Sequence, residues 1–402
     1  MLRVYTPDLT FVGIVDDYEE ILTVRRFHEP GEIVARIHAN KPNSKLLLKN
    51  RIVQVGDGFY ILKERAIDDM GTRGNCWVVR GWTLSGITRQ RLIVPDSIES
   101  TDYYLPDLIN VSPGHWAENY LGWIDGLDSE PVETVMKYFV ERNLITPEGI
   151  ARRINNLVNA PDQGRGTSII RSSRLESLSD VLTELSDHYN MGWAITGDLT
   201  NKELVFEVYE STDRSIEQDL YTPVILHYDT DAFRSLIYIN SDVGYVNIAY
   251  TGGEIASATV TQDGSDYNLN AQLVVPVGES SGLDRYEGVV NASDIKSFTG
   301  ISEENPLQLL QVYGSARLAQ YHQEHADGVA RPNYQYVFGV DYQLGDVITT
   351  VHPHWDLTLS AQVVEIREVY DAIGYSYDVV LASRLKGFPQ MLRKYLADLG
   401  IK

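Results

Sequence analysis

The chain contains very little cysteine and no long hydrophobic run. Its 402 residues include one cysteine, Cys76, so an internal disulfide and a multi-cysteine zinc site are both excluded. Cys76 lies in the strand-like run "NCWVVRGWTLSG", where we expect a buried, unreactive thiol rather than a nucleophile. No stretch approaches the ~18 apolar residues of a membrane span, and Arg3, Asp8 and Asp16 interrupt any apolar N-terminal region. The sequence therefore predicts a protein without a membrane span that folds in a reducing cytoplasm.

Basic residues are also scarce, because 34 Lys and Arg face 56 Asp and Glu and give a net charge of -22. Such a chain is a poor candidate for holding DNA or an anionic membrane, since both attract positive charge. Phe and Trp are few, at 9 and 6, whereas Tyr reaches 25. Tyrosine suits pleated, half-buried surfaces, and this composition favours a mainly β protein rich in interfaces.

The usual motifs of phosphate binding and nucleophilic catalysis are missing. The "GRGTS" segment at 164–168 lacks the lysine and the spacing of a P-loop, and "GTRGNC" at 71–76 lacks the third glycine of a dinucleotide fingerprint. The nucleophile elbow G-x-S-x-G is absent. Carboxylates are too abundant for a glycosidase pair to be selected or excluded from the sequence.

One polar stretch resembles the start of a calcium loop. Asp266, Asn268 and Asn270 occupy alternate positions, as the first ligands of such a loop would. The sixth position requires glycine and is Ala271, and the twelfth requires glutamate and is Val277. A polar turn before a strand explains the stretch better.

A first histidine pair, His322 and His325, lies three residues apart on a predicted helix. The zinc-protease helix needs H-E-x-x-H, with the histidines four apart and a glutamate placed as a base. Both the spacing and the glutamate differ here. The solvated polar end of a helix is the better interpretation.

A second pair, His352 and His354, lies in "VHPHWD" between two alternating runs. Pro353 falls at the tip, where no ladder hydrogen bond is lost. A hairpin loop therefore explains these residues without a ligand, and its exposed Trp355 and histidines are suited to touching a neighbouring subunit. We expect no catalytic, cofactor-binding or metal-ligating residue and no cofactor.

The first hundred residues read as short strands. Ile33, Ala35 and Ile37 alternate on one face, and a hairpin is predicted at Gly56-Asp57-Gly58. After Leu357 the apolar face of a long run changes register between Val363 and Val364, which indicates a bulge or a barrel bend. Closely spaced strands of this kind favour a small barrel or sandwich.

Helical periodicity appears only after residue 130. Apolar spacing predicts helices within residues 129–144 and 177–190, a third over 305–327, and an amphipathic run over 388–402. The first two helices, with a hairpin after residue 190, indicate an α+β insertion in an otherwise β chain.

Four segments together resemble a known family, the tail hub or tail-associated proteins at the distal tip of long-tailed bacteriophages (siphophage baseplate hubs). They are "FVGIVDDYEEILTVRRFHEPGEIVARIHAN", "GWAITGDLTNKELVFEVYESTDRS", "GLDRYEGVVNASDI" and "YVFGVDYQLGDVITTVHPHWDLTLSAQVVEIREVY". They occur in this order over nearly the whole chain. Each is structural rather than catalytic, so the resemblance rests on the set.

The resemblance implies a mainly β, multi-domain subunit with two small β-barrels and an α+β insertion, assembled as a homotrimeric ring. The implied division is a first barrel from 1–105, the insertion from 106–215, a β-rich segment with a connecting helix completing the first barrel over 216–330, and the second barrel with a C-terminal helix over 331–402. It further implies a structural protein rather than an enzyme.

The implied function is to close the tail tube, link the distal tail ring to tip, fibre or receptor-binding proteins, and gate DNA ejection. Its partners would be further copies of itself, the distal tail ring, the tape measure protein, those tip proteins, and viral DNA passing through the lumen without specific binding. It would reside in the virion after assembly in the host cytoplasm. Two alternatives stay open: a glycan-binding or cell-wall-degrading virion protein, and a hub of a phage-derived injection device.

Overall fold

The fold is mainly β with an α+β insertion, as the sequence predicts. A computed structural model describes residues 1–69, 75–94, 130–291 and 324–382, except residues 167, 170, 172, 174, 243, 263, 264 and 332–334, together with Gly314 and Leu318. The chain divides into two compact units. The first combines Met1–Leu236 with Gly328–Leu381, and the second contains Ile237–Asp327.

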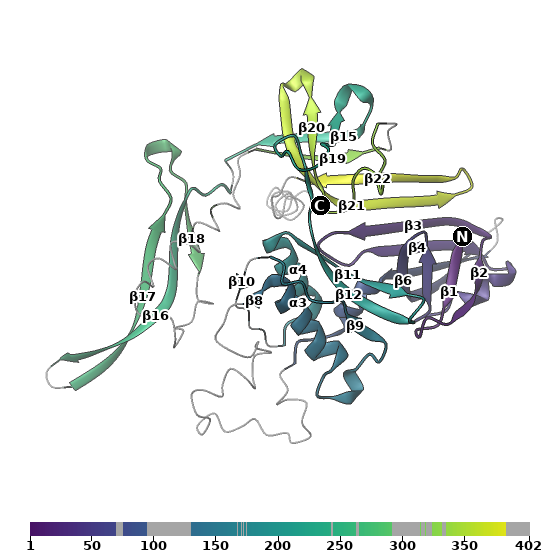
Figure 1. The fold of residues 1–402 in the computed structure, drawn as a ribbon, viewed down its shortest axis with the longest axis horizontal. Helices are drawn as coiled ribbons and strands as arrows, with labels where there is room; N and C mark the ends of the chain where they lie inside the picture. Colours follow the sequence, from purple (N-terminus) through teal and green to yellow (C-terminus); the bar gives the residue numbers. More distant parts are fainter. Residues whose placement is uncertain are drawn as a thin grey trace. The chain divides into compact units, whose positions relative to one another are not determined.

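Fourteen strands form one sheet in the order β15-β19-β22-β21-β3-β4-β7-β6-β5-β1-β2, with β20 beside β21 and with β13 and β14 beside β20 (Figure 1). Their bounds are β1 Leu2–Tyr5, β2 Phe11–Val15, β3 Tyr18–Arg26, β4 Glu32–His38, β5 Ile52–Val55, β6 Gly58–Asp69, β7 Asn75–Thr83, β13 Asp213–Arg214, β14 Ile225–His227, β15 Phe233–Asn240, β19 Glu324–Ala330, β20 Val347–His352, β21 Leu357–Asp371 and β22 Tyr375–Ala382.

The long strand β21 joins the N-terminal strands to the C-terminal ones. Its first part pairs with β20, up to Gln362 opposite Val347, and its second part pairs with β3, from Glu365 opposite Arg26. The register change expected at 363–364 therefore marks a change of partner strand. For the same reason the two closed barrels expected from the sequence are not found among the described residues, where one continuous sheet takes their place.

Strand β14 lies in the segment 216–330 that was expected to complete the first barrel. It pairs instead with β20, in parallel, with Leu226 opposite Thr350. Strand β13 pairs in parallel with the start of β20. The edge of β20 that does not face β21 is thus covered by residues from 213–227, which no local sequence pattern indicates.

The alternation predicted for the N-terminal strands is confirmed. Ile33, Ala35 and Ile37 of β4 are buried and pack in one apolar cluster with residues of β1, β5, β6 and β7. The hairpin between β5 and β6 turns at Gly56 and Asp57, and Gly56 has a φ of +55°, which glycine adopts without a steric cost.

The α+β insertion contains both predicted helices. Helix α3 spans Val132–Val140 and continues into a π turn at Glu141–Ile145, and α4 spans Leu178–Tyr189. Ser177 accepts a hydrogen bond from the Asp180 N–H as the N-cap of α4, and Asn190 ends that helix in a left-handed conformation. The insertion also contains its own three-stranded sheet, in the order β11-β12-β9, and a separate two-stranded sheet of β8 and β10. Their bounds are β8 Glu130–Pro131, β9 Leu157–Asn159, β10 Ser168–Ile169, β11 Met191–Asp198 and β12 Glu203–Glu210.

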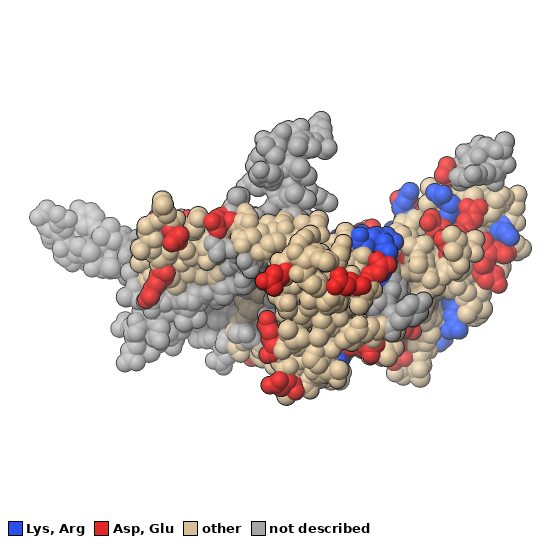
Figure 2. All heavy atoms as spheres, turned by 90° about the horizontal axis from the view of Figure 1, so that it is seen from above, with Lys and Arg blue, Asp and Glu red and all other residues tan. Residues whose placement is uncertain are grey.

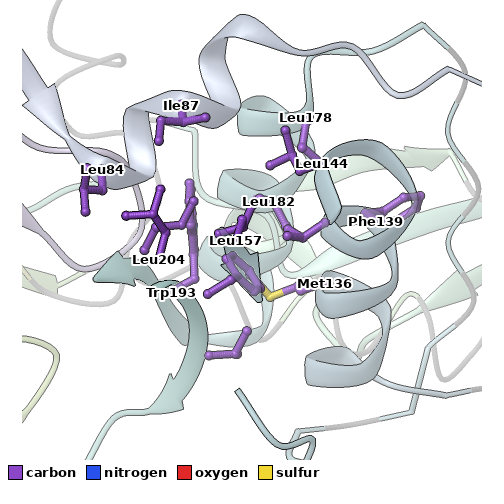
Figure 3. Packing of buried hydrophobic residues seen from close by; sticks show 14 of the residues in the cluster. Leu84, Ile87, Met136, Phe139, Leu144, Leu157, Leu178, Leu182, Trp193 and Leu204 are labelled. Carbon is purple, nitrogen blue, oxygen red and sulfur yellow. The ribbon is translucent and has the colours of Figure 1, made fainter. Parts of the chain in front are cut away.

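One hydrophobic core contains residues of the insertion together with Tyr5 of β1, Ile52 of β5 and Ile61 of β6. Figure 3 shows part of this core. Met136 and Phe139 of α3, Leu182 of α4 and Trp193 of β11 are all at most 2% exposed. Leu84, from the 3-10 turn η3 at Leu84–Gln90, joins the same cluster. The insertion is therefore fixed to the N-terminal strands by continuous apolar packing.

The second unit is built on a long hairpin. Strand β16 (Ile248–Gln262) pairs with β17 (Ser265–Val277) in the antiparallel sense and with β18 (Glu287–Asn291) in parallel. Further 3-10 turns among the described residues are η1 Pro42–Leu46, η5 Ile150–Arg152, η6 Tyr228–Thr230, η7 Gly282–Asp284 and η8 Pro353–Trp355.

The third predicted helix is wrong at its C-terminal end. Gly314 and Leu318 are helical, but residues from Glu324 onward form β19, which pairs with β22 at Gly328 opposite Leu381. The position of β19 between β15 and β22 in the sheet therefore outweighs the helical pattern of residues 324–327. The run predicted over 388–402 lies outside the described residues. No described helix has the length and apolar character needed to cross a bilayer.

Candidate interaction site

The hairpin between β20 and β21 has the turn that the sequence predicts. Strand β20 ends at His352, Pro353–Trp355 form one 3-10 turn, and Asp356 takes a left-handed conformation with a φ of +51° before β21 begins. Pro353 lies at the tip, where its missing N–H breaks no ladder bond. The sequence interpretation of this segment as a hairpin loop is confirmed.

His352 is buried within this turn, so the expectation that both histidines are exposed is wrong for His352. Its side chain is only 3% exposed, and its ring stacks on Trp355 at a centroid distance of 3.8 Å and an angle of 15°. Tyr228 lies against it at 4.1 Å. The Nδ1 atom of His352 is buried without a hydrogen-bond partner among the described residues. The imidazole therefore holds the indole of Trp355 in a fixed orientation.

A second turn lies beside the tip because β14 runs parallel to β20. His227 is opposite Val351, so the residues that follow it, in η6, reach the hairpin turn. The Asp229 N–H donates to Nδ1 of His227, and Oδ1 of Asp229 lies 3.5 Å from Nε2 of His354. The rings of Tyr228 and His354 are 6.4 Å apart, edge to face. We call Tyr228, His352, His354 and Trp355 the aromatic tip.

Three of the four residues of the aromatic tip are exposed, and two acidic side chains lie next to them. The exposed fractions are 44% for Tyr228 and 51% for Trp355, and the His354 side chain reaches 72%. Asp229 and Asp356 are both exposed, and neither forms an ion pair with Lys or Arg in the described part of the chain. Aromatic faces beside unneutralised carboxylates can contact a cation, or can stack on and hydrogen-bond to a hydroxylated ring.

The residues considered as metal ligands in the sequence lie in separate strands and turns. Within the described ranges, no three His, Cys, Asp or Glu side chains lie close enough to hold an ion. His325, expected on a helix, lies in strand β19, and its predicted companion His322 is outside the described residues. Asp266 and Asn270 lie in the extended strand β17 rather than in the tight loop that calcium requires.

Cys76 is buried in β7 at 1% exposure, and its thiol donates to Oε1 of Glu19 over 3.3 Å. Burial raises the pKa of the Cys76 thiol, and the neighbouring Glu19 carboxylate raises it further. The reactive thiolate is therefore disfavoured.

Two groups of buried charges were not detected from the sequence. Glu133 of α3 is fully buried and contacts Lys137 one turn later and Arg165 of the following loop, at 2.9 Å from Nε of Arg165 to Oε2. Burial alone would raise the pKa of Glu133, but hydrogen bonds from Arg165 and Lys137 outweigh it and lower the pKa to about 2. The other group, Arg25 with Glu368, lies between β3 and β21. Apart from Glu133 with Lys137, which are four residues apart in α3, these contacts join residues that are distant in the sequence.

A cavity of about 390 Å³ opens where the end of β3 meets β11. Among its lining residues are Arg25, Arg26, Trp193, Tyr209 and Phe338. Both arginines are already neutralised, because Arg25 pairs with Glu368 and Arg26 pairs with Glu365. Of the two acidic residues in the lining, Glu29 lies 3.5 Å from Arg26, and Asp57 has no Lys or Arg partner among the described residues. The aromatic tip, where exposed aromatic rings lie beside two such carboxylates, is the better candidate site.

Comparison with protein families gives one match that spans the chain. The model of a family described as "Siphovirus ReqiPepy6 Gp37-like protein" matches residues 1–112 and 116–381. No curated protein sequence matches the chain significantly.

Solved structures with a similar fold include three tail proteins, two of which are described as prophage proteins. The prophage tail protein gp18 of Listeria monocytogenes has a TM-score of 0.55 at 9% identity, with 99% of each chain covered. The 43 kDa tail protein of prophage MuSo2 from Shewanella oneidensis has a TM-score of 0.54 at 9% identity, covering 95% of this chain and 98% of that one. A tail protein of Neisseria meningitidis reaches 0.53 at 11% identity, with 95% and 96% covered. At these identities the likeness establishes a shared fold.

Proposed function

Because the chain belongs to the family of Siphovirus ReqiPepy6 Gp37-like proteins, we propose that it is a structural component of a phage tail, located at the distal tip. One observation carries this proposal: the fold matches three tail proteins over at least 95% of their length and of this chain. A match over nearly the full length includes the insertion and the second unit as well as the large sheet. A match to one small domain would say little about function, because unrelated proteins share such domains.

In the proposed role the protein forms a homotrimeric hub that closes the tail tube and gates DNA ejection. Its partners are the distal tail ring, the tape measure protein and the tip, fibre or receptor-binding proteins, and its place is the virion after assembly in the host cytoplasm. The role is structural rather than enzymatic. The continuous sheet supports this interpretation, because backbone pairing of β3 with β21 joins strands from distant parts of the sequence, which suits a load-bearing ring.

The test is the mass and shape of the purified protein, alone and with the neighbouring tail ring protein. We expect a species three times the mass of the 45.3 kDa chain in native mass spectrometry and ring-shaped particles in negative stain. A monomer under both conditions, with no ring in either set of images, would contradict the proposed hub.

The proposed passage of DNA draws support from charge. Three copies of a chain with a net charge of -22 would repel duplex DNA and let it slide through a lumen without binding. On the face drawn in Figure 2, acidic side chains are spread over the described surface, whereas basic ones gather in a few places. A basic lumen in a structure of the assembled ring would contradict this part of the proposal.

The enzymatic alternative has its own test. The protein is incubated with purified cell-wall fragments, and the soluble fraction is analysed for released sugars and peptides. A structural hub releases neither, so release above that of a heat-denatured sample would overturn the structural role.

A further inference from the structure

The aromatic tip combines three properties that together indicate a recognition site. The exposed rings of Trp355 in the hairpin turn and Tyr228 in the adjacent turn η6 lie at one end of β20, two exposed carboxylates border them, and the Trp355 ring stacks on the buried His352. The Trp355 ring stacks on the imidazole of His352, and His352 is only 3% exposed. Ordering such a surface on binding costs little entropy, because the turn already holds it.

The charge around the tip selects one class of partner. Among the described residues, the basic side chains within ion-pair distance of Asp229 are His227 and His354. Asp356 has no Lys or Arg within ion-pair distance in the same part of the chain. Asp231, at the end of η6, pairs with Arg331 at 3.5 Å but remains 84% exposed as a side chain. A guanidinium can stack on an indole or phenol face while donating to carboxylates. None of the described Lys or Arg side chains lies over the ring of Trp355 or Tyr228.

We propose that the aromatic tip docks an arginine-bearing segment of a different tail protein, with the guanidinium on Trp355 or Tyr228 and its N–H groups donating to Asp229 or Asp356. A second copy of this chain is the less suitable partner, since each copy carries a charge of -22. The choice of arginine over lysine follows from the planar, bidentate geometry that a ring beside a carboxylate can satisfy. The proposal rests on the proposed function only in taking the partner from the same tail.

The first experiment uses a labelled peptide with arginine and glycine in alternation, and the same peptide with citrulline in place of arginine. Binding to the full chain is followed by fluorescence anisotropy at about 0.15 M salt, where long-range attraction is screened. We expect the arginine peptide to bind and the citrulline peptide to bind at least about fivefold more weakly. Equal binding of both peptides would overturn the proposal.

Two variants separate the tip from general attraction to an acidic protein. Asp229→Asn and Asp16→Asn remove the same charge, but Asp16 is an exposed residue near the N-terminus, outside the tip. We expect Asp229→Asn to weaken the arginine peptide at least about fivefold and Asp16→Asn to leave its affinity nearly unchanged. An equal loss in both variants would mean non-specific attraction and would sink the proposal.

A third pair tests the role of the aromatic face. Trp355→Phe keeps an aromatic ring, whereas Trp355→Leu keeps only apolar bulk, so affinity should fall more in the leucine variant. Equal affinities would show apolar contact rather than guanidinium stacking. The Tm of each variant is measured first, and Tyr228→Leu, on the neighbouring turn, serves as the second variant if Trp355→Leu fails to fold.

The native partner and two competing occupants are tested on the assembled tail. Cross-linking from a photoreactive group at position 354, followed by mass spectrometry, should identify an arginine-containing segment of another tail protein. Cross-links to a second copy of this chain, or Trp355-dependent binding of a neutral cell-wall oligosaccharide, would overturn the proposal. Trimer formation by Trp355→Leu is recorded alongside, so that loss of docking with an intact ring is distinguishable from failure of the hub itself.

Discussion

Arg25 and Glu368 form an ion pair across the boundary between β3 and β21, with Nη2 of Arg25 lying 3.2 Å from Oε2 of Glu368. The Thr23 hydroxyl donates to the same carboxylate over 3.2 Å, and the Tyr375 hydroxyl donates to its other oxygen over 3.0 Å. Burial alone would lower the pKa of Arg25, but Glu368 raises it above its ordinary value. The N-terminal strands, which end at β3, and the C-terminal strands, which begin at β21 in the order of the sheet, are thus joined by an ion pair as well as by backbone hydrogen bonds.

Removing this carboxylate should weaken the connection between the two groups. In Glu368→Ala, Arg25 keeps its charge in a largely buried position with no partner, so we expect the free energy of unfolding to fall by about 2 to 3 kcal/mol. Urea denaturation followed by circular dichroism measures this loss. The surface pair of Arg80 with Glu64, in which both side chains are about half exposed, gives the control.

Glu64→Ala should cost less than about 1 kcal/mol, because exposed ion pairs contribute little. If both substitutions cost the same amount, the pair of Arg25 with Glu368 does not stabilise the boundary beyond an ordinary surface contact.

Glu133 gives a prediction on pH. Its pKa is lowered to about 2 from an ordinary value of 4.5, so the ionised side chain stabilises the fold above pH 4.5, and this contribution is lost as the pH falls towards 2. The difference in unfolding free energy between wild type and Glu133→Gln should therefore be largest at neutral pH and shrink below pH 4.5. Urea titrations at several pH values from 7 to 2.5 measure it.

Glu184→Gln is the matched control, because its carboxylate pairs with Arg171 at the surface and is 56% exposed. Its effect should be small at every pH. A constant difference between wild type and Glu133→Gln over the whole range would refute the assigned pKa.

The sequence was most informative for elements whose pattern of buried residues follows from the periodicity of that element alone. The alternation of Ile33, Ala35 and Ile37 identified β4, and apolar spacing with a serine start identified α4. The register change predicted at 363–364, interpreted as a bulge or a barrel bend, lies where β21 changes its partner from β20 to β3. Periodicity reports which face of an element is buried, but it does not report which element buries it.

What could not be predicted depends on contacts between distant segments. Tyr228 and Asp229 belong to the tip only because β14 pairs in parallel with β20, and the run "VILHYD" carries no sign of that pairing. The sequence identified Trp355 but missed its two neighbours for this reason. In the same way, residues 324–327 end the predicted helix over 305–327 but belong to β19, which lies between β15 and β22 in the sheet.

Phe27 supplies a prediction on close packing. It is fully buried, and a Cβ atom added at Gly192 of β11 would lie 2.4 Å from both its ring and that of Tyr209. Gly192→Ala should therefore displace the Phe27 ring and cost about 1 to 3 kcal/mol. A smaller side chain in Phe27→Leu should relieve part of this clash, so the double variant should lose less stability than the sum of the single ones. Additive losses in denaturant titrations would mean that the ring moves freely.

His352 and His354 should respond very differently to the same substitution. His352 lies between Trp355 and Tyr228 with 3% exposure, so His352→Ala leaves a cavity and should cost about 1 to 3 kcal/mol. His354 is 72% exposed as a side chain, and His354→Ala should change the unfolding free energy by less than about 0.5 kcal/mol. The two variants are each other's control, since both remove an imidazole from one turn.

The environment of Trp355 gives a second measurement of the same relationship. Loss of the stacked imidazole in His352→Ala should let the indole move, and this should appear as a changed near-ultraviolet circular dichroism signal that Trp355→Phe removes. His354→Ala should leave that signal in place. If the stability loss and the spectral change instead follow His354, the buried position of His352 is wrong, and with it the argument that the tip is a pre-ordered surface.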